Sequence, residues 1–276
     1  MKTNAIVRIV LLSIAIIVLL TILLVGIAAG MFMFTGSETS TTSSGNVPAA
    51  EVRSISVDWA AGSITIRTAD TNQITFTETG AEDSDVMVWR HAGDKLEIDY
   101  SEPQIGIRFG NTSSKHLLIE VPRDWSLNEL EIEAASADLD VDSLLIATVD
   151  FDGASGYCRF QDCTVDVLDV DTASGNIQFI GTLNVLECDA ASADCDITLT
   201  NSPSRIDMDM ASGDLTLALP EDCGFTAELE GLSGSIESEF DTTVRSGTHV
   251  YGDGSCRISV SALSGDISIR KNISAQ

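Results

Sequence analysis

From Leu130 onward, hydrophobic and polar residues alternate in short runs that are separated by a recurring corner of small residues. Each corner contains a serine, and the seven serines are Ser136, Ser155, Ser174, Ser192, Ser212, Ser233 and Ser264. The steps between them are 19, 19, 18, 20, 21 and 31 residues. The residue after each of these serines is Gly or Ala, which suits a backbone that turns sharply or closely approaches another segment.

The alternation has a period of two on both sides of the corner, which predicts half-buried strands. Around Ser174, for example, Leu168 and Val170 come before the corner and Ile177 and Phe179 follow it. Strands that recur at a fixed spacing without intervening helices predict an all-β fold, a β-solenoid with stacked coils of about 19 residues. A β-sandwich is the main alternative, but it does not require one corner motif to recur in phase.

The outward positions of this repeat carry the most specific signal in the chain. In six of the seven copies, the residues five and three before the corner Ser are all acidic. The first set is Glu131, Asp150, Asp169, Glu187, Asp207 and Glu228, and the second is Glu133, Asp152, Asp171, Asp189, Asp209 and Glu230. Stacked coils would place them in two carboxylate ladders on one face. Like charges in register destabilise neighbouring strands, so we expect this face to be well hydrated or to bind a cationic partner.

The N-terminal residues 1–34 are expected to form a transmembrane anchor. An uncharged stretch of 26 residues, 9–34, follows Lys2 and Arg8, and about 20 apolar residues suffice to span a bilayer. A cleaved signal peptide is the alternative, because Ala28-Ala29-Gly30 could serve as its cleavage site. The basic flank predicts a single-pass protein of the cell membrane with a cytoplasmic N-terminus and an extracytoplasmic C-terminal domain.

The remaining chain divides into three parts. Residues 35–50 form a Ser/Thr-rich linker. Residues 51–128 are an irregular β region that is expected to cap the solenoid and contains a degenerate corner near Gly62. Residues 129–276 form the regular β-solenoid, with a hairpin-like insertion near 239–257. The last strand is expected to be an edge, protected from pairing by Arg270 and Lys271.

Charge and cysteine content restrict the partners and the chemistry. The chain has 15 basic and 42 acidic residues, a net charge of −27, which excludes nucleic acid as a partner because phosphate binding needs basic surfaces. The favoured interpretation of the six cysteines is buried thiols. Cys188 and Cys195 flank one corner and are the only pair with disulfide potential, whereas Cys163, Cys223 and Cys256 have no evident partner.

No residue pattern indicates catalysis. The three histidines are scattered, and the corner serines lack the context of a nucleophile. No cofactor is predicted, with one exception: the corner acids Asp138, Asp194, Asp214 and Asp266 are weak candidate ligands for a divalent cation such as Ca²⁺. A hydrated acidic surface is the simpler interpretation of these residues.

The Val121-Pro122 junction, the segment Leu130-Glu-Ile-Glu-Ala-Ala-Ser-Ala-Asp and the repeated Ala-Ser-Gly-Asp corners resemble the bacterial "putative adhesin" or Toastrack-type β-strand-repeat family. The resemblance covers about residues 51–271. It implies a β-solenoid-like fold that is often tethered to a membrane and often encoded near envelope-stress regulators. The family's activity is largely uncharacterised, and it has no catalytic residues to transfer.

Three functions are compatible with these observations. The favoured one is a non-catalytic, adhesin-like interaction module that binds a cationic partner, divalent ions or another envelope component, such as a cationic or envelope protein, through its acidic ladders. A carbohydrate-active enzyme on a β-solenoid scaffold is the alternative, since paired carboxylates can perform acid–base chemistry. The third is a structural or regulatory component of an envelope-stress circuit, whose acidity serves only solubility.

Overall fold

A computed structural model describes residues 39–81, 86–100 and 115–273, and the predicted membrane segment 1–34 lies outside them. Within those ranges, no helix is long and apolar enough to cross a membrane. Apart from one short 3₁₀ helix, η1 (Ala49–Glu51), the regular elements are β-strands. The described part of the chain is therefore all-β, as the two-residue periodicity predicted.

The strands join into one sheet that winds around a continuous core. Those of the N-terminal region are β1 (Ser40–Thr41), β2 (Ser44–Pro48), β3 (Ser54–Ala69), β4 (Gln73–Thr79), β5 (Val88–Ala92), β6 (Lys95–Asp99) and β7 (Lys115–Pro122). The regular stack contains β8 (Ser126–Asp142), β9 (Leu145–Gly153), β10 (Tyr157–Leu199), β11 (Arg205–Ser212) and β12 (Leu215–Leu219). The C-terminal part contains β13 (Phe225–Ser233), β14 (Ile236–Ser238), β15 (Thr243–Arg245), β16 (Thr248–Tyr251), β17 (Cys256–Ser264) and β18 (Ile267–Lys271).

In the middle of the molecule, each coil lies on the next in a parallel arrangement. β8 pairs with β9 and with the start of β10, and the end of β10 pairs with β11 and β12. The register joins equivalent positions, so that Glu133 is the partner of Asp152, and Asp152 is the partner of Asp171. Inward apolar residues at equivalent positions are buried in the core between the stacked coils. This is the solenoid that the constant step predicted.

The corner glycines allow the coils to approach closely. Gly213 has a φ of +137°, and a Cβ built on it would lie 1.9 Å from the carbonyl oxygen of Ala193 in the neighbouring coil. Gly175 has a φ of +151°, and its Cβ would lie 2.3 Å from the carbonyl oxygen of Gly156. Only glycine combines these dihedrals with so short an approach, which accounts for the small residue after the corner Ser.

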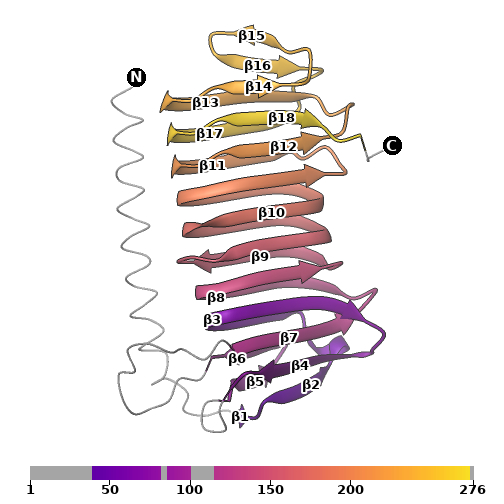
Figure 1. The fold of residues 1–276 in the computed structure, drawn as a ribbon. Coiled ribbons are helices and arrows are strands. Elements are labelled where there is room, and N and C mark those ends of the chain that lie inside the picture. The colour runs from indigo at the N-terminus through magenta and orange to yellow at the C-terminus, as the bar shows by residue number, and fades with distance from the viewer. Residues whose placement is uncertain (1–38, 82–85, 101–114, 274–276) are drawn as a thin grey trace.

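The stacking order differs from the chain order at the C-terminal end. β17 lies between β11 and β13, and β18 lies between β12 and β14, so the last coil is inserted beneath the one that precedes it in sequence (Figure 1). The expectation that β18 is a free edge protected by Arg270 and Lys271 is therefore wrong. The longer step before Ser264 contains the antiparallel hairpin of β15 and β16, which pairs with β13 at the end of the stack.

The stacking order also differs from the chain order at the N-terminal end. β3 lies between β8 on one side and β6 and β7 on the other, although β6 and β7 follow it in sequence (Figure 1). Residues 54–67 of β3 are in register with residues 129–142 of β8, so β3 has the geometry of a regular coil. Antiparallel pairings of β2, β4 and β5 complete this end. β1 and β2 lie within the predicted linker 35–50, and Val47 is buried, so the expectation of a linker is wrong for these strands.

An ion pair lies inside the N-terminal end. The Lys115 Nζ is 3.1 Å from Glu78 Oε1 and 4.0 Å from the centroid of the Tyr100 ring, and both charged side chains are almost fully buried. The other Glu78 oxygen accepts a hydrogen bond of 2.6 Å from the backbone N–H of Met87. Removal of one partner from such a pair leaves a buried charge, which typically costs about 3–5 kcal/mol. The alternating sequence pattern gave no indication of this pair.

Candidate functional site

The two predicted acidic ladders lie on one outer face of the stack. The file that contains Glu133, here called the Glu133 file, runs in the order Asp99, Asp58, Glu133, Asp152, Asp171, Asp189, Asp209, Ser261 and Glu230. Its step from Asp171 to Asp189 lies within β10, where the two carboxylates repel each other. The neighbouring Glu131 file runs in the order Glu97, Ser56, Glu131, Asp150, Asp169, Glu187, Asp207, Ser259 and Glu228. The five acids from Glu133 to Asp209 are thus in single file, as the phase of the repeat predicted.

The structure extends the Glu133 file beyond the predicted residues. Asp58 of β3 is the partner of Glu133, and Asp99 of β6 is the partner of Asp58. Sequence analysis missed both residues, although Asp58 stands three positions before Ala61, which takes the place of the corner Ser. Alignment of the degenerate corner with the regular copies would have identified Asp58.

The files are interrupted at the C-terminal end. Because β17 is inserted between β11 and β13, Ser261 separates Asp209 from Glu230, and Ser259 separates Asp207 from Glu228. The prediction of two unbroken ladders in chain order is therefore wrong for Glu228 and Glu230. The inserted coil relieves like-charge contact at the point where the chain reverses its stacking order.

Five carboxylates of the Glu133 file have raised pKa values: Asp99, Glu133, Asp152, Asp171 and Asp189. Partial burial, followed by repulsion from acids in the same and adjacent coils, raises the pKa of Asp152 to about 7. The same causes raise the pKa values of Asp171 and Asp189 to about 6. Burial and Glu97 raise the pKa of Asp99 to about 6. At neutral pH, this file therefore holds unfavourable negative charge that a nearby cation would stabilise.

The Glu131 file has partial compensation from basic residues. The Lys95 Nζ lies 2.8 Å from Glu131 Oε2, and this hydrogen bond lowers the pKa of Glu131. Arg205 forms ion pairs with Glu187 and with Asp207. Between these points, burial and neighbouring acids raise the pKa values of Asp150 and Asp169.

In the Glu133 file, no ion pair joins the five acids from Glu133 to Asp209 to any basic residue of the described chain. The two files thus differ in their compensation, although they lie on the same face. The Glu133 file is the better candidate for an external cationic partner.

The four candidate cation ligands at the corners form hydrogen bonds between coils. Asp138 Oδ1 accepts the backbone N–H of Tyr157 at 2.9 Å, and Asp194 Oδ1 accepts that of Asp214 at 3.0 Å. Asp214 Oδ1 accepts the N–H of Asp266 at 2.9 Å, and Asp266 Oδ1 accepts that of Ser235 at 2.7 Å. No group of three or more His, Cys, Asp or Glu side chains in the described ranges is placed to hold a metal ion. These four carboxylates therefore connect neighbouring coils along the stack through hydrogen bonds to the backbone.

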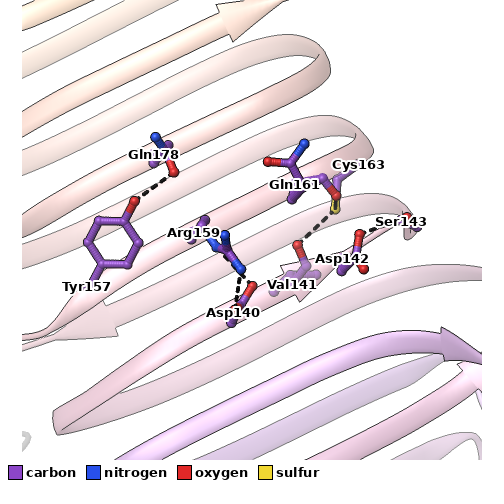
Figure 2. A network of polar contacts seen from close by, with 9 residues as sticks. All are labelled: Asp140, Val141, Asp142, Ser143, Tyr157, Arg159, Gln161, Cys163 and Gln178. Atoms are coloured by element: carbon purple, nitrogen blue, oxygen red, sulfur yellow. Dashed lines mark hydrogen bonds and ion pairs between the residues drawn. The ribbon is translucent and has the colours of Figure 1, made fainter.

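The outward residues that come after the corner in each coil form a second outer face. On this face, charged and amide side chains form hydrogen bonds with side chains of adjacent coils. Figure 2 shows Arg159 donating to Asp140 of the adjacent coil, with Nη2 to Oδ2 at 2.5 Å, and the Tyr157 hydroxyl donating to Gln178 Oε1 at 2.7 Å. Tyr157 and Gln178 also border a hollow of about 370 Å³ together with Asp194, Asp196 and Asp214.

Two histidines lie near hydroxyl groups. His116 Nδ1 is 2.8 Å from Ser63 Oγ, and His249 Nδ1 is 3.4 Å from Thr242 Oγ1. A nucleophilic serine needs a histidine that is itself oriented by an acid. Asp138 is the register partner of Ser63 on its other side, so the three residues do not form that arrangement.

All six cysteines are buried free thiols, as the favoured interpretation held. The Cys188 and Cys195 thiols are hydrogen-bonded to each other across their corner, as their phase suggested. Cys223 and Cys256 are also hydrogen-bonded to each other, so the expectation that they have no partner is wrong. Their contact depends on the insertion of β17, which their spacing in the sequence does not show.

Comparison with known proteins fits this geometry. The family model described as Toastrack DUF4097 matches residues 52–201 and 181–270. The chain belongs to the Toastrack DUF4097 family. No curated protein matches it.

Among solved structures, a putative adhesin from Bacteroides fragilis is similar over 86% of this chain and 98% of its own, with 12% identity and a TM-score of 0.50. A putative cell adhesion protein from Clostridium sporogenes covers 86% of this chain and 100% of its own, with 12% identity and a TM-score of 0.42. At this identity, the first likeness supports the Toastrack fold, and the second carries no argument.

Proposed function

We propose that this Toastrack protein is a non-catalytic surface module, anchored by residues 1–34 and exposed outside the cytoplasm, whose Glu133 file binds a cationic protein partner. The observation that carries the proposal is the file itself: Glu133, Asp152, Asp171, Asp189 and Asp209 lie in adjacent coils, with pKa values of about 6–7 at its centre. Description of a similar fold as a putative adhesin is consistent with a binding role.

The physical basis is linkage between charge and binding. Ionisation of one carboxylate in the file opposes ionisation of the next, because the coils are only about 4.8 Å apart. A row of Lys or Arg side chains from a partner would supply basic groups at Asp152, Asp171 and Asp189, which form no ion pair within the described chain. Binding would then fall with increasing salt, since exposed charges are screened, and would also fall below pH 6 as the acids take up protons.

The test measures binding of an oligolysine peptide to the full-length chain in uncharged detergent at pH 7.5. The triple variant Asp152→Asn, Asp171→Asn, Asp189→Asn should weaken binding by about tenfold or more, since each lost charge pair contributes up to ~1 kcal/mol. A control triple variant, Asp124→Asn, Glu237→Gln, Asp241→Asn, makes the same change in net charge at acids outside the file. Equal losses of affinity in both variants would show that the effect depends on net charge alone, which would contradict a specific role of the file.

A carbohydrate-active enzyme remains the second candidate, supported by the hollow on the second face. Tyr157 offers an aromatic surface, Asn176 and Gln178 offer amides, and the lining includes no Lys, Arg or His. Release of reducing ends from an uncharged polysaccharide, abolished by Asp196→Asn, would favour this candidate over a purely binding module.

A further inference from the structure

The insertion of the last coil brings together two cysteines that are far apart in sequence. Cys223 lies in the link between β12 and β13, and Cys256 is the first residue of β17. The backbone N–H of Cys256 donates to the carbonyl oxygen of Gly224 at 2.9 Å, and Cys256 is the register partner of Phe225. Both cysteines have 0% exposure.

The two thiols are neighbours that share a hydrogen bond. The Cys256 thiol donates a hydrogen bond to the Cys223 sulfur, and this bond, opposed by burial and aided by Ser202, lowers the pKa of Cys223 to about 7. The same bond and burial raise the pKa of Cys256. The nearby acids Asp222 and Asp253 oppose the Cys223 thiolate. The Gly224 carbonyl oxygen lies beside both cysteines, because it accepts from the Cys256 N–H at 2.9 Å and from the Cys223 thiol at 3.8 Å. The two sulfurs are therefore close enough to react with each other, and the lowered pKa favours Cys223 as the attacking group.

We propose that Cys223 and Cys256 are a cross-linking site, where an intramolecular disulfide forms when the chain folds in an oxidising compartment. The Cys223 thiolate attacks the disulfide of a small exchange partner and releases one thiolate. The Cys256 sulfur then attacks Cys223 in the mixed disulfide, and the second thiolate of the partner leaves with the proton of Cys256. Two cysteine thiols are oxidised, and one partner disulfide is reduced to two thiols.

The cross-link would close the C-terminal end of the solenoid. Residues 224–255 lie between the two cysteines and contain β13, β14, β15 and β16, which together cover the inserted β17 and β18. With the disulfide formed, the start of β13 is held beside the start of β17, which restricts opening of this covering layer. Because both sulfurs are buried, the exchange partner has access during folding or after local opening of this layer, which sets the design of the test.

The test uses the full-length chain, purified in detergent with reductant, unfolded in urea and refolded by dilution. One sample refolds with a mixture of oxidised and reduced glutathione, and the other refolds with reductant alone. Trypsin cleaves after Arg205, Arg245 and Arg257, which separates Cys223 (peptide 206–245) from Cys256 (peptide 246–257). Cys188 and Cys195 share peptide 160–205, so mass spectrometry distinguishes the two cysteine pairs.

The expected result is a linked pair of peptides, 206–245 with 246–257, that lacks two hydrogens and disappears on reduction. The oxidised sample should also melt about 5–10 °C higher than the reduced one, as a loop of this length predicts. The variant Cys223→Ser, Cys256→Ser should lose this gain in melting temperature. Recovery of both peptides as separate alkylated thiols from folded, glutathione-treated protein would overturn the proposal, whether or not the serine variant folds.

The cross-link in the cell requires the extracytoplasmic location of the proposed function, because cytosolic thiols are kept reduced. The refolding test does not depend on that location or on the Glu133 file. Failure of the disulfide and failure of the oligolysine test are therefore separate results.

Discussion

The two outer faces of the solenoid come from the same coils but differ in how their charged side chains are paired. Before the corner, the Glu133 file places acid beside acid, with partial burial and raised pKa values. After the corner, acid stands beside base or amide, as with Asp140 and Arg159 (Figure 2). In a stack of parallel coils, each side chain has the equivalent residue of the next coil as its neighbour. The ionisation of an outward residue therefore depends on its burial and on charges in both its own coil and the neighbouring coils.

The largest expected effect is a gain in stability from neutralising the Glu133 file. At pH 8, Asp152→Asn, Asp171→Asn, Asp189→Asn should raise the free energy of unfolding by about 2 kcal/mol, after allowance for the screening of half-exposed side chains. Urea unfolding measures it. The control triple variant Asp124→Asn, Glu237→Gln, Asp241→Asn should stay within about 0.5 kcal/mol of the original chain, and a loss of stability in the file variant would contradict the comparison.

The stability of the original chain should depend on pH because of the same carboxylates. The folded pKa values of about 6–7 lie above the ~3.9 of an unfolded aspartate. The folded chain thus binds more protons in this window, and its stability falls as pH rises from 4 to 7. We expect a loss of about 2 kcal/mol between pH 5 and 8, measured by urea unfolding at each pH. The file variant should flatten this profile, and an unchanged slope would assign the effect to other groups.

A smaller effect is expected where the inserted coil interrupts the file. Ser261→Asp would place a carboxylate between Asp209 and Glu230, and should lower the free energy of unfolding at pH 8 by about 1 kcal/mol. The matched change on the second face is Ser268→Asp, between Thr216 and Glu237. Arg270 Nε already donates to the Ser268 hydroxyl at 3.2 Å and would offset the repulsion from Glu237. That control should change stability little, and equal losses in both variants would mean that the face makes no difference.

The smallest effect is expected from the paired face. Asp140→Asn should reduce stability by about 0.5 kcal/mol at low salt and less at high salt, because the ion pair with Arg159 is partly exposed. Thermal unfolding at two salt concentrations measures it. A cost as large as that of Ser261→Asp would show that pairing on this face contributes more than its exposure suggests.

The coil and the files could be predicted from the sequence because both depend on local phase. A step of 18–21 residues and a period of two determine which residues are inward, outward or at the corner. Asp152 and Asp171 lie in register for that reason alone. Glycine at the corners was equally visible, because its cause is a contact that recurs in nearly every coil.

The stacking order could not be predicted in the same way. Every coil has the same phase, so β17 fits equally well above β13 or below it. The sequence evidence for the inserted coil lay in departures from the repeat. These are the longer step before Ser264, and Ser259 and Ser261 in place of acids. Two further contacts join chain segments at the two ends of the stack: Cys223 with Cys256, and Lys115 with Glu78. The phase of the repeat does not predict which segments meet there.

The inserted coils also determine how such a rod can change its length. At each end of the described chain, the first or last full coil is held under a layer that folds back over it, so an extra unit added there would have to displace that layer. A duplication of one unit in the middle would meet identical neighbours above and below and leave both ends intact. Related proteins should therefore differ in length through internal gain or loss of units, and a protein engineer should extend the rod at the same place.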